Sequence, residues 1–129
     1  MKQILSNDII NQYMPTLVKC PLFNTLGEPE LRSYLNNAKV IIHSYKKNDF
    51  IALAGDPMEG IGVILEGSAL LTRENVMGQR VIMANLEQSD IFGEALLFSK
   101  QPLWPATIKA TKATKIMFIP LETLDRKST

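Results

Sequence analysis

The chain has 129 residues, a formal net charge of +1 and 21% charged residues, which fits one domain of ordinary size. This balance argues against a nucleic-acid-binding surface, which normally carries a basic stripe. The single cysteine excludes an internal disulfide framework, and we find neither a membrane span nor a signal-peptide core. We therefore expect one soluble domain in the cytoplasm.

Two amphipathic helices are predicted in the first third of the chain. Apolar residues at helical spacing predict the first helix over residues 9–17, and Pro15 should end or kink it near Met14. The second helix is predicted over residues 28–37, because it opens with acidic residues and a proline and ends at two asparagines.

After the second helix the hydrophobic period becomes that of strands. Short runs of strand-forming residues alternate with turn signals about every 8–12 residues, which predicts a β-sandwich or barrel. The predicted strands are 40–45, 50–53, 62–65, 68–73, 79–86, 108–110 and 115–119. A short helical turn is predicted at 93–98, and Pro120 should open a further helix that continues through 121–124. The chain ends before that helix is complete, so we expect a fragment of a longer protein.

The sequence offers little for catalysis. A phosphate loop needs a lysine and a hydroxyl after its second glycine, and Gly60 is followed by neither. His43 is the single histidine and Cys20 the single cysteine, which leaves too few ligands for a catalytic metal and no evident thiol dyad. We therefore expect no enzymatic activity and no cofactor.

Three segments carry a family resemblance: residues 55–67, the hairpin at Gly78, and residues 90–98. They resemble the cyclic-nucleotide-binding domain of the catabolite-activator/fumarate–nitrate-regulator family of bacterial transcription factors. The resemblance implies a mainly β jelly roll, with N-terminal helices at 1–38, the effector-binding barrel at 39–119 and the start of a dimerisation helix at 120–129. In that family the helix leads to a helix-turn-helix that binds DNA.

The resemblance also implies a ligand site. In nucleotide-binding members, amides of the short helical turn meet the cyclic phosphate, a glutamate accepts from the ribose, and an arginine pairs with the phosphate. Glu94 matches the glutamate, but an ungapped count puts Trp104 in the place of the arginine, and Pro105 removes an amide donor. Ser89 stands where the family usually has glycine. The candidate ligand-binding residues are Phe92, Gly93, Glu94, Ala95, Trp104, Pro105 and Ala106.

The missing arginine sets the expected ligand. Loss of a charge-assisted pair costs about 2–5 kcal/mol in binding, or roughly 30- to 4,000-fold. We therefore predict that cyclic AMP binds weakly or not at all, and that Trp104 suits an aromatic or amphipathic metabolite. The expected partners are this small-molecule effector, a second copy in the full-length protein, and DNA only through a C-terminal domain. No metal or membrane partner is expected.

Plainer structural roles stay open at this stage. Trp104 could be a hydrophobic cap beside neighbouring prolines, Glu94 a helix-start residue, His43 a strand residue and Cys20 a small buried apolar group. One alternative for the whole chain is a stand-alone interaction module that has lost ligand binding. A barrel enzyme is the other alternative, which the shortage of His and Cys disfavours.

Overall fold

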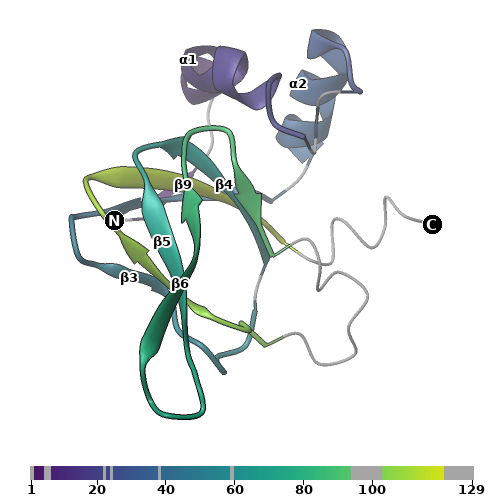
Figure 1. The fold of residues 1–129 in the computed structure, drawn as a ribbon. Coiled ribbons are helices and arrows are strands. Elements are labelled where there is room, and N and C mark those ends of the chain that lie inside the picture. The colour runs from purple at the N-terminus through teal and green to yellow at the C-terminus, as the bar shows by residue number, and fades with distance from the viewer. Residues whose placement is uncertain are drawn as a thin grey trace.

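The computed structural model describes residues 2–4, 7–21, 23, 25–37, 39–58, 60–93 and 103–120. Within these ranges the chain forms two helices and a mainly β body (Figure 1). The helices are α1 (Asn7–Leu17) and α2 (Glu28–Asn37). The strands are β1 (Lys2–Ile4), β2 (Ile41–Tyr45), β3 (Phe50–Ala52), β4 (Gly60–Glu66), β5 (Ala69–Glu74), β6 (Arg80–Leu86), β7 (Ile91–Phe92), β8 (Thr107–Ala110) and β9 (Thr114–Pro120).

The strands form two antiparallel sheets. One sheet has the order β1-β2-β9-β4-β7 and the other β3-β8-β5-β6. Because β2 and β3, and also β4 and β5, lie in different sheets, the chain crosses repeatedly between the two layers, as it does in a jelly roll. The predicted jelly roll is confirmed, and each of the seven predicted strands is present to within two residues at either end.

Two strands were not predicted. β1 pairs with β2 at the edge of the first sheet, and β7 pairs with β4 at the opposite edge. With three and two residues, they are too short to show a hydrophobic period, so only their pairing defines them. Most of the predicted helical turn at 93–98, and residues 121–124 of the predicted further helix, lie outside the described residues. Pro120 does not open that helix, because it pairs with Gly60 as the last residue of β9.

The pairing register separates the two faces of the first sheet. Ile42, Met117 and Val63 lie side by side on β2, β9 and β4, and all three are buried. Tyr13 of α1 reaches Glu66 on this same face, so α1 packs against it. Since side chains alternate along a strand, the other face of this sheet is directed toward the second sheet, and this inner face carries the site.

Pro15 does not end α1, so the predicted end near Met14 is wrong. The helix continues to Leu17, and the amide of Val18 still donates to the Met14 carbonyl at 3.0 Å. Met14 and Leu17 are buried, whereas Pro15 is exposed. Burial of two such side chains contributes about 3–6 kcal/mol, which offsets the ~3 kcal/mol that an interior proline costs.

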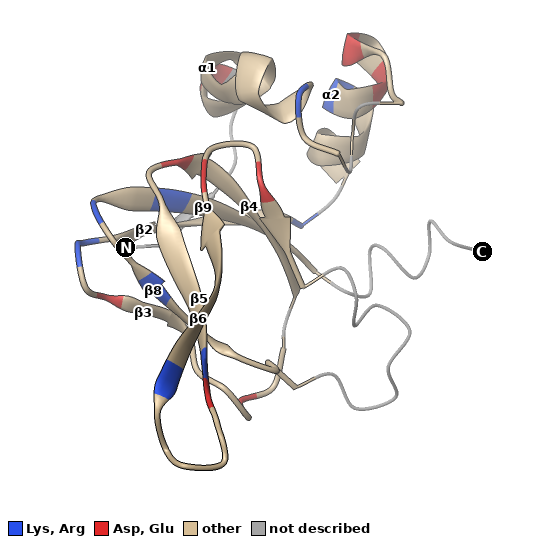
Figure 2. Cartoon of the chain, viewed as in Figure 1, with Lys and Arg blue, Asp and Glu red and all other residues tan. Residues whose placement is uncertain are grey.

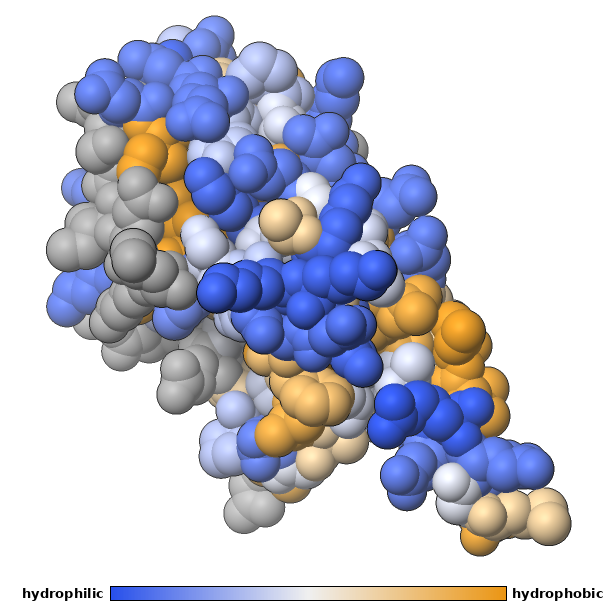
Figure 3. Space-filling model, turned by 90° about the vertical axis from the view of Figure 1, so that its left-hand side faces the viewer, coloured by the Kyte–Doolittle hydropathy of each residue, from blue (hydrophilic) through white to orange (hydrophobic). Residues whose placement is uncertain are grey.

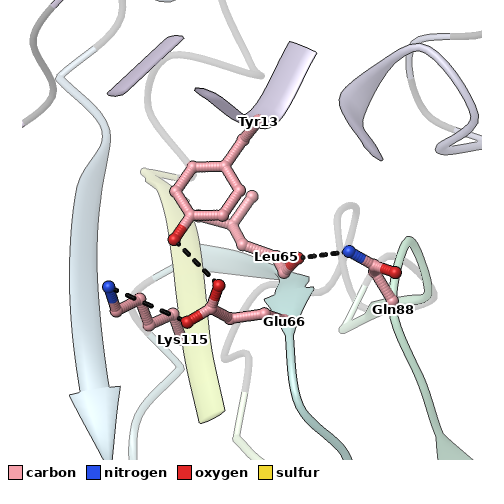
Figure 4. Close-up of polar contacts among 5 residues, drawn as sticks. All are labelled: Tyr13, Leu65, Glu66, Gln88 and Lys115. Carbon is pink, nitrogen blue, oxygen red and sulfur yellow. Dashed lines mark hydrogen bonds and ion pairs between the residues drawn. The ribbon is translucent and has the colours of Figure 1, made fainter. Parts of the chain in front are cut away.

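Polar contacts also fix α1 to the roll (Figure 4). The Tyr13 hydroxyl donates to the Glu66 carboxylate at 3.2 Å, and the Lys115 ammonium lies 3.8 Å from the other carboxylate oxygen. Burial raises the pKa of Tyr13, and the negative charge of Glu66 raises this pKa further. Next to this cluster the Gln88 amide donates to the Leu65 carbonyl at 3.1 Å. Helix and roll thus share one polar seam as well as one core.

Two turns share an uncommon backbone conformation. Asn48 and Ser89 both have a φ of +76°, in the left-handed region that favours glycine. In both turns the next residue, Asp49 or Asp90, accepts a bond from the backbone amide three residues before it, at 2.8 Å. The Ser89 hydroxyl also donates to the Thr16 carbonyl of α1 at 2.9 Å. This bond offsets the conformational cost of a non-glycine residue there.

The described surface has no single-sign stripe: positive and negative residues are interspersed over helices and strands (Figure 2). The β5–β6 hairpin projects from the roll (Figure 1). In the space-filling view, apolar surface lies over a projecting end of the molecule (Figure 3). The exposed apolar residues of this hairpin are Val76, Met77, Val81, Ile82 and Met83. No helix of the described part is long and apolar enough to cross a membrane.

Candidate functional site

A cavity of about 590 Å³ opens on the inner face of the first sheet. β2 and β9 supply one wall, β3 and the segment that follows it supply the second, and Trp104 lies beside them. This volume lies within the ordinary range for a small-molecule pocket. The described lining residues are Ile41, His43, Tyr45, Phe50, Ile51, Ala52, Leu53, Asp56, Pro57, Gly60, Trp104, Phe118 and Pro120.

Backbone hydrogen bonds position Trp104 at the cavity. The Gly55 amide donates to the Trp104 carbonyl at 2.8 Å, and the Trp104 amide donates to the Asp56 carbonyl at 2.9 Å. Leu103 and Pro57 form a β-bridge beside these bonds. The Trp104 side chain is only 8% exposed, and its ring centroid lies 5.7 Å from that of Phe92. The indole is therefore a fixed part of the wall.

Two glycines allow the aromatic residues to approach the backbone closely. A Cβ on Gly62 would lie 2.5 Å from both Cε atoms of Phe92 and closer still to Cζ, so the ring rests directly on β4. Gly93 has a φ of +94°, and a Cβ there would lie 2.8 Å from the Met58 methyl and 3.3 Å from the Trp104 ring. Glycine is thus required at position 62 by the packing of Phe92, and at position 93 by the left-handed backbone beside Met58 and Trp104.

The β2–β9 wall of the cavity is also aromatic. His43 meets Phe118 edge-on, with centroids 5.6 Å apart and planes at 79°. The ring of Tyr45 lies 6.2 Å from that of His43. Burial raises the pKa of Tyr45 to about 12, and the charge of Asp49 adds to this shift, so the phenol is neutral near pH 7. The wall therefore presents rings and a neutral hydroxyl.

The described lining contains one ionisable acid, Asp56, and neither lysine nor arginine. Asp56 is exposed at the cavity, and none of the described hydrogen bonds or ion pairs engages its carboxylate. The described residues also hold no group of three or more His, Cys, Asp or Glu side chains placed for a metal ion. This part of the lining suits uncharged or cationic groups better than anionic ones.

The predicted site residues divide into three groups. Phe92, Gly93 and Trp104 are in mutual contact, and Trp104 lines the cavity. Pro105 is exposed and Ala106 buried, and neither lines the described cavity. Glu94 and Ala95 lie outside the described residues.

The sequence analysis missed several lining residues, above all Tyr45, Asp56 and Phe118. It placed His43 in a strand but not in a cavity wall. The available signal was the alternation of 41, 43 and 45 on one face of a strand. That alternation identifies a shared face, but it does not say which face is directed toward the second sheet.

The family is established by comparison with known proteins. Residues 42–127 match the cyclic nucleotide-binding domain family, and this chain belongs to it. It is 32% identical over 89 residues to the cAMP-activated global transcriptional regulator CRP of Pasteurella multocida (strain Pm70). The match covers 69% of this chain and 42% of that protein, so the chain spans less than half the length of its curated relative.

Solved structures share the fold. The sensor domain of the transcriptional regulator DNR from Pseudomonas aeruginosa superposes with a TM-score of 0.79 at 19% identity, over 94% of this chain and 79% of that one. The N-terminal domain of a transcriptional regulator from Streptomyces coelicolor A3(2) gives 0.71 at 26% identity, over 86% and 76%. The regulatory domain of Toxoplasma gondii PKA with cAMP gives 0.79 at 19% identity, over 95% and 45%. The similar proteins are thus regulatory rather than enzymatic.

Proposed function

We propose that this domain is the effector sensor of a cytoplasmic transcription regulator and that its effector is a small molecule other than cyclic AMP. The observation that carries the proposal is that Trp104, which an ungapped count aligns with the family's arginine, lines a cavity of about 590 Å³. An indole offers a large apolar surface and a stacking face, whereas it offers no charge to a phosphate. The cavity is therefore suited to an aromatic or amphipathic effector.

Electrostatics support the exclusion of a cyclic phosphate. A phosphate removed from water needs amide dipoles and a cation, because an uncompensated buried charge costs several kcal/mol. The described lining supplies no cation, and Asp56 adds a negative charge. Relative to a site with the arginine, we expect cyclic AMP affinity to fall by roughly 30- to 4,000-fold.

Signal transfer would act on the segment beyond Pro120, the last described residue of β9, which itself lines the cavity. In the proposed full-length dimer, the effector would favour one arrangement of the following helix and so of the C-terminal helix-turn-helix. A ligand shifts such an equilibrium only by its differential affinity for the two arrangements. Contact between effector and Pro120 is the direct route from cavity to helix.

Thermal unfolding with and without ligand tests this proposal. A ligand at 100 times its dissociation constant adds about 2.7 kcal/mol, which raises the midpoint of a domain of this size by roughly 10 °C. We expect no such rise with millimolar cyclic AMP or cyclic GMP, and a rise with members of a panel of ring compounds. Trp104→Leu should abolish the rise.

A rise with a cyclic nucleotide would contradict the role assigned to the missing arginine. If neither nucleotides nor ring compounds raise the midpoint, the alternative gains support: a stand-alone module whose roll no longer binds a ligand. The matched control is Val76→Ala on the exposed hairpin, which should leave every ligand response unchanged.

A further inference from the structure

The chemistry of the cavity wall limits the charge of its ligand. Tyr45, Trp104 and Phe118 supply aromatic surface to the lining, and Asp56 supplies the one carboxylate among its described residues. The face of an aromatic ring carries negative electrostatic potential, which attracts an ammonium within about 6 Å of the ring centroid. Ring faces and a carboxylate together attract cations and repel anions.

The Asp56 carboxylate is available for such a role. The aspartates of the two left-handed turns, Asp49 and Asp90, each accept a backbone amide at 2.8 Å and so stabilise their turns. By contrast, Asp56 contributes to its turn through its backbone. Its amide donates to the Leu53 carbonyl, and its carbonyl accepts from the Trp104 amide. In the described part of the chain its side chain makes no hydrogen bond or ion pair.

An ammonium group already lies on one of the lining rings. The Lys109 Nζ atom is 5.6 Å from the centroid of Phe50, a half-exposed ring at the rim of the cavity. Lys109 itself does not line the cavity, because its strand neighbours Ile108 and Ala110 are the buried residues of β8. The rim therefore already carries one ammonium outside the lining, and the Phe50 ring that it contacts is not among the proposed ligand contacts.

We propose that the cavity selects an aromatic amine, with the ring against Trp104 and Phe118 and the ammonium directed toward Asp56. This inference rests on the proposed function, namely that the cavity binds a small molecule. It goes further by assigning the charge of that molecule and the residue that selects it. The removal of an aromatic amine from water costs less here than that of an anion, since the wall replaces part of its hydration.

Three compounds that share one ring test the inference: 2-phenylethylamine, 2-phenylethanol and 3-phenylpropionate. Trp104 is the single tryptophan of the chain, so its fluorescence reports directly on the cavity, and the phenyl probes do not interfere. We expect the dissociation constant of the amine to be lower than that of the alcohol by about 3- to 10-fold, and the acid to bind weakest. Added salt should reduce the preference for the amine, because Asp56 is exposed.

Two variants distinguish the effect of the Asp56 charge from the effect of its side-chain shape. Asp56→Asn keeps the side-chain size and should abolish the preference for amine over alcohol, while the affinity for the alcohol stays the same. Glu74→Gln removes an exposed carboxylate of β5 that does not line the cavity and should leave the preference intact. Circular dichroism of each variant checks the fold.

The possible results distinguish the two proposals. Tighter binding of the acid or the alcohol than of the amine overturns the charge assignment but leaves the proposed effector site standing. An amine preference that survives in Asp56→Asn overturns the role of Asp56. If none of the three compounds changes the fluorescence at millimolar concentration, the aromatic-amine assignment is wrong, and the thermal-unfolding panel then decides the proposed function separately.

Discussion

Gly62 and Phe92 offer the sharpest test of how the cavity wall is built. Phe92 is 5% exposed and is enclosed by Trp104 and Phe118, with ring centroids at 5.7 Å and 6.1 Å. A methyl group at Gly62 would lie 2.5 Å from both Cε atoms of this ring, whereas carbon atoms prefer about 3.5–4.0 Å. Since the Cζ atom would lie closer still, the ring must retreat by more than 1 Å into neighbours that are themselves packed.

The cost follows from this enclosure. Overpacking of a core costs about 1–3 kcal/mol, and we place Gly62→Ala near 3 kcal/mol because Phe92 has no free side. At this chain length that loss lowers the melting midpoint by roughly 10 °C. Phe92→Leu alone should cost about 1–2 kcal/mol through lost packing. In the double variant the shorter side chain makes room for the methyl group, so the total should be about 2–3 kcal/mol rather than the sum.

Urea unfolding of the wild type, both single variants and the double variant measures this coupling, which we expect to be at least ~1 kcal/mol. Gly27→Ala is the matched control, because a Cβ there meets only the Pro29 ring at 3.8 Å. Because Gly27 is the N-cap of α2, where its carbonyl accepts the Leu31 amide and glycine is preferred over alanine, this variant should cost at most about 1 kcal/mol, and it should show no coupling to Phe92→Leu. Additivity of the two single variants would refute the argument, since it would mean that Phe92 is not the obstacle.

Three further outcomes are expected. Ser89→Ala and Ser89→Gly both lose the bond to α1, but only alanine keeps the left-handed backbone strain. In urea unfolding Ser89→Ala should therefore be less stable than Ser89→Gly by about 1 kcal/mol; equal stability would contradict this. In the polar seam, Tyr13→Phe should cost about 1 kcal/mol, whereas Lys115→Met should cost at most ~0.5 kcal/mol, because its ion pair is half-exposed; the reverse order would contradict this ranking of the two contacts. The raised pKa of Tyr45 gives stability that is complete below pH 10 and is lost as the pH rises toward about 12. Tyr45→Phe should therefore flatten the decline of the melting midpoint in that range, and an unchanged decline would assign it to other groups.

The sequence by itself determined the class of fold. Its strand-forming runs and turn signals define seven of the nine described strands, because half-buried strands have a period of two and the turns between them need polar residues. It also assigned Phe92, Gly93 and Trp104 to one candidate ligand site, through a short motif and a count along the chain, and the structure brings these three residues together. These features depend on local chemistry, which a sequence displays directly.

Tertiary structure decided the rest. Pro15 stays inside α1 because Met14 and Leu17 are buried against the roll, a gain that no local propensity contains. The cavity brings Tyr45, Asp56 and Trp104 together from distant parts of the chain. Their meeting depends on the register of β2 with β9 and on the crossing of the chain between two sheets. Pairing between distant strands is a property of the whole fold, so the wall of this cavity forms only once the sheets are assembled.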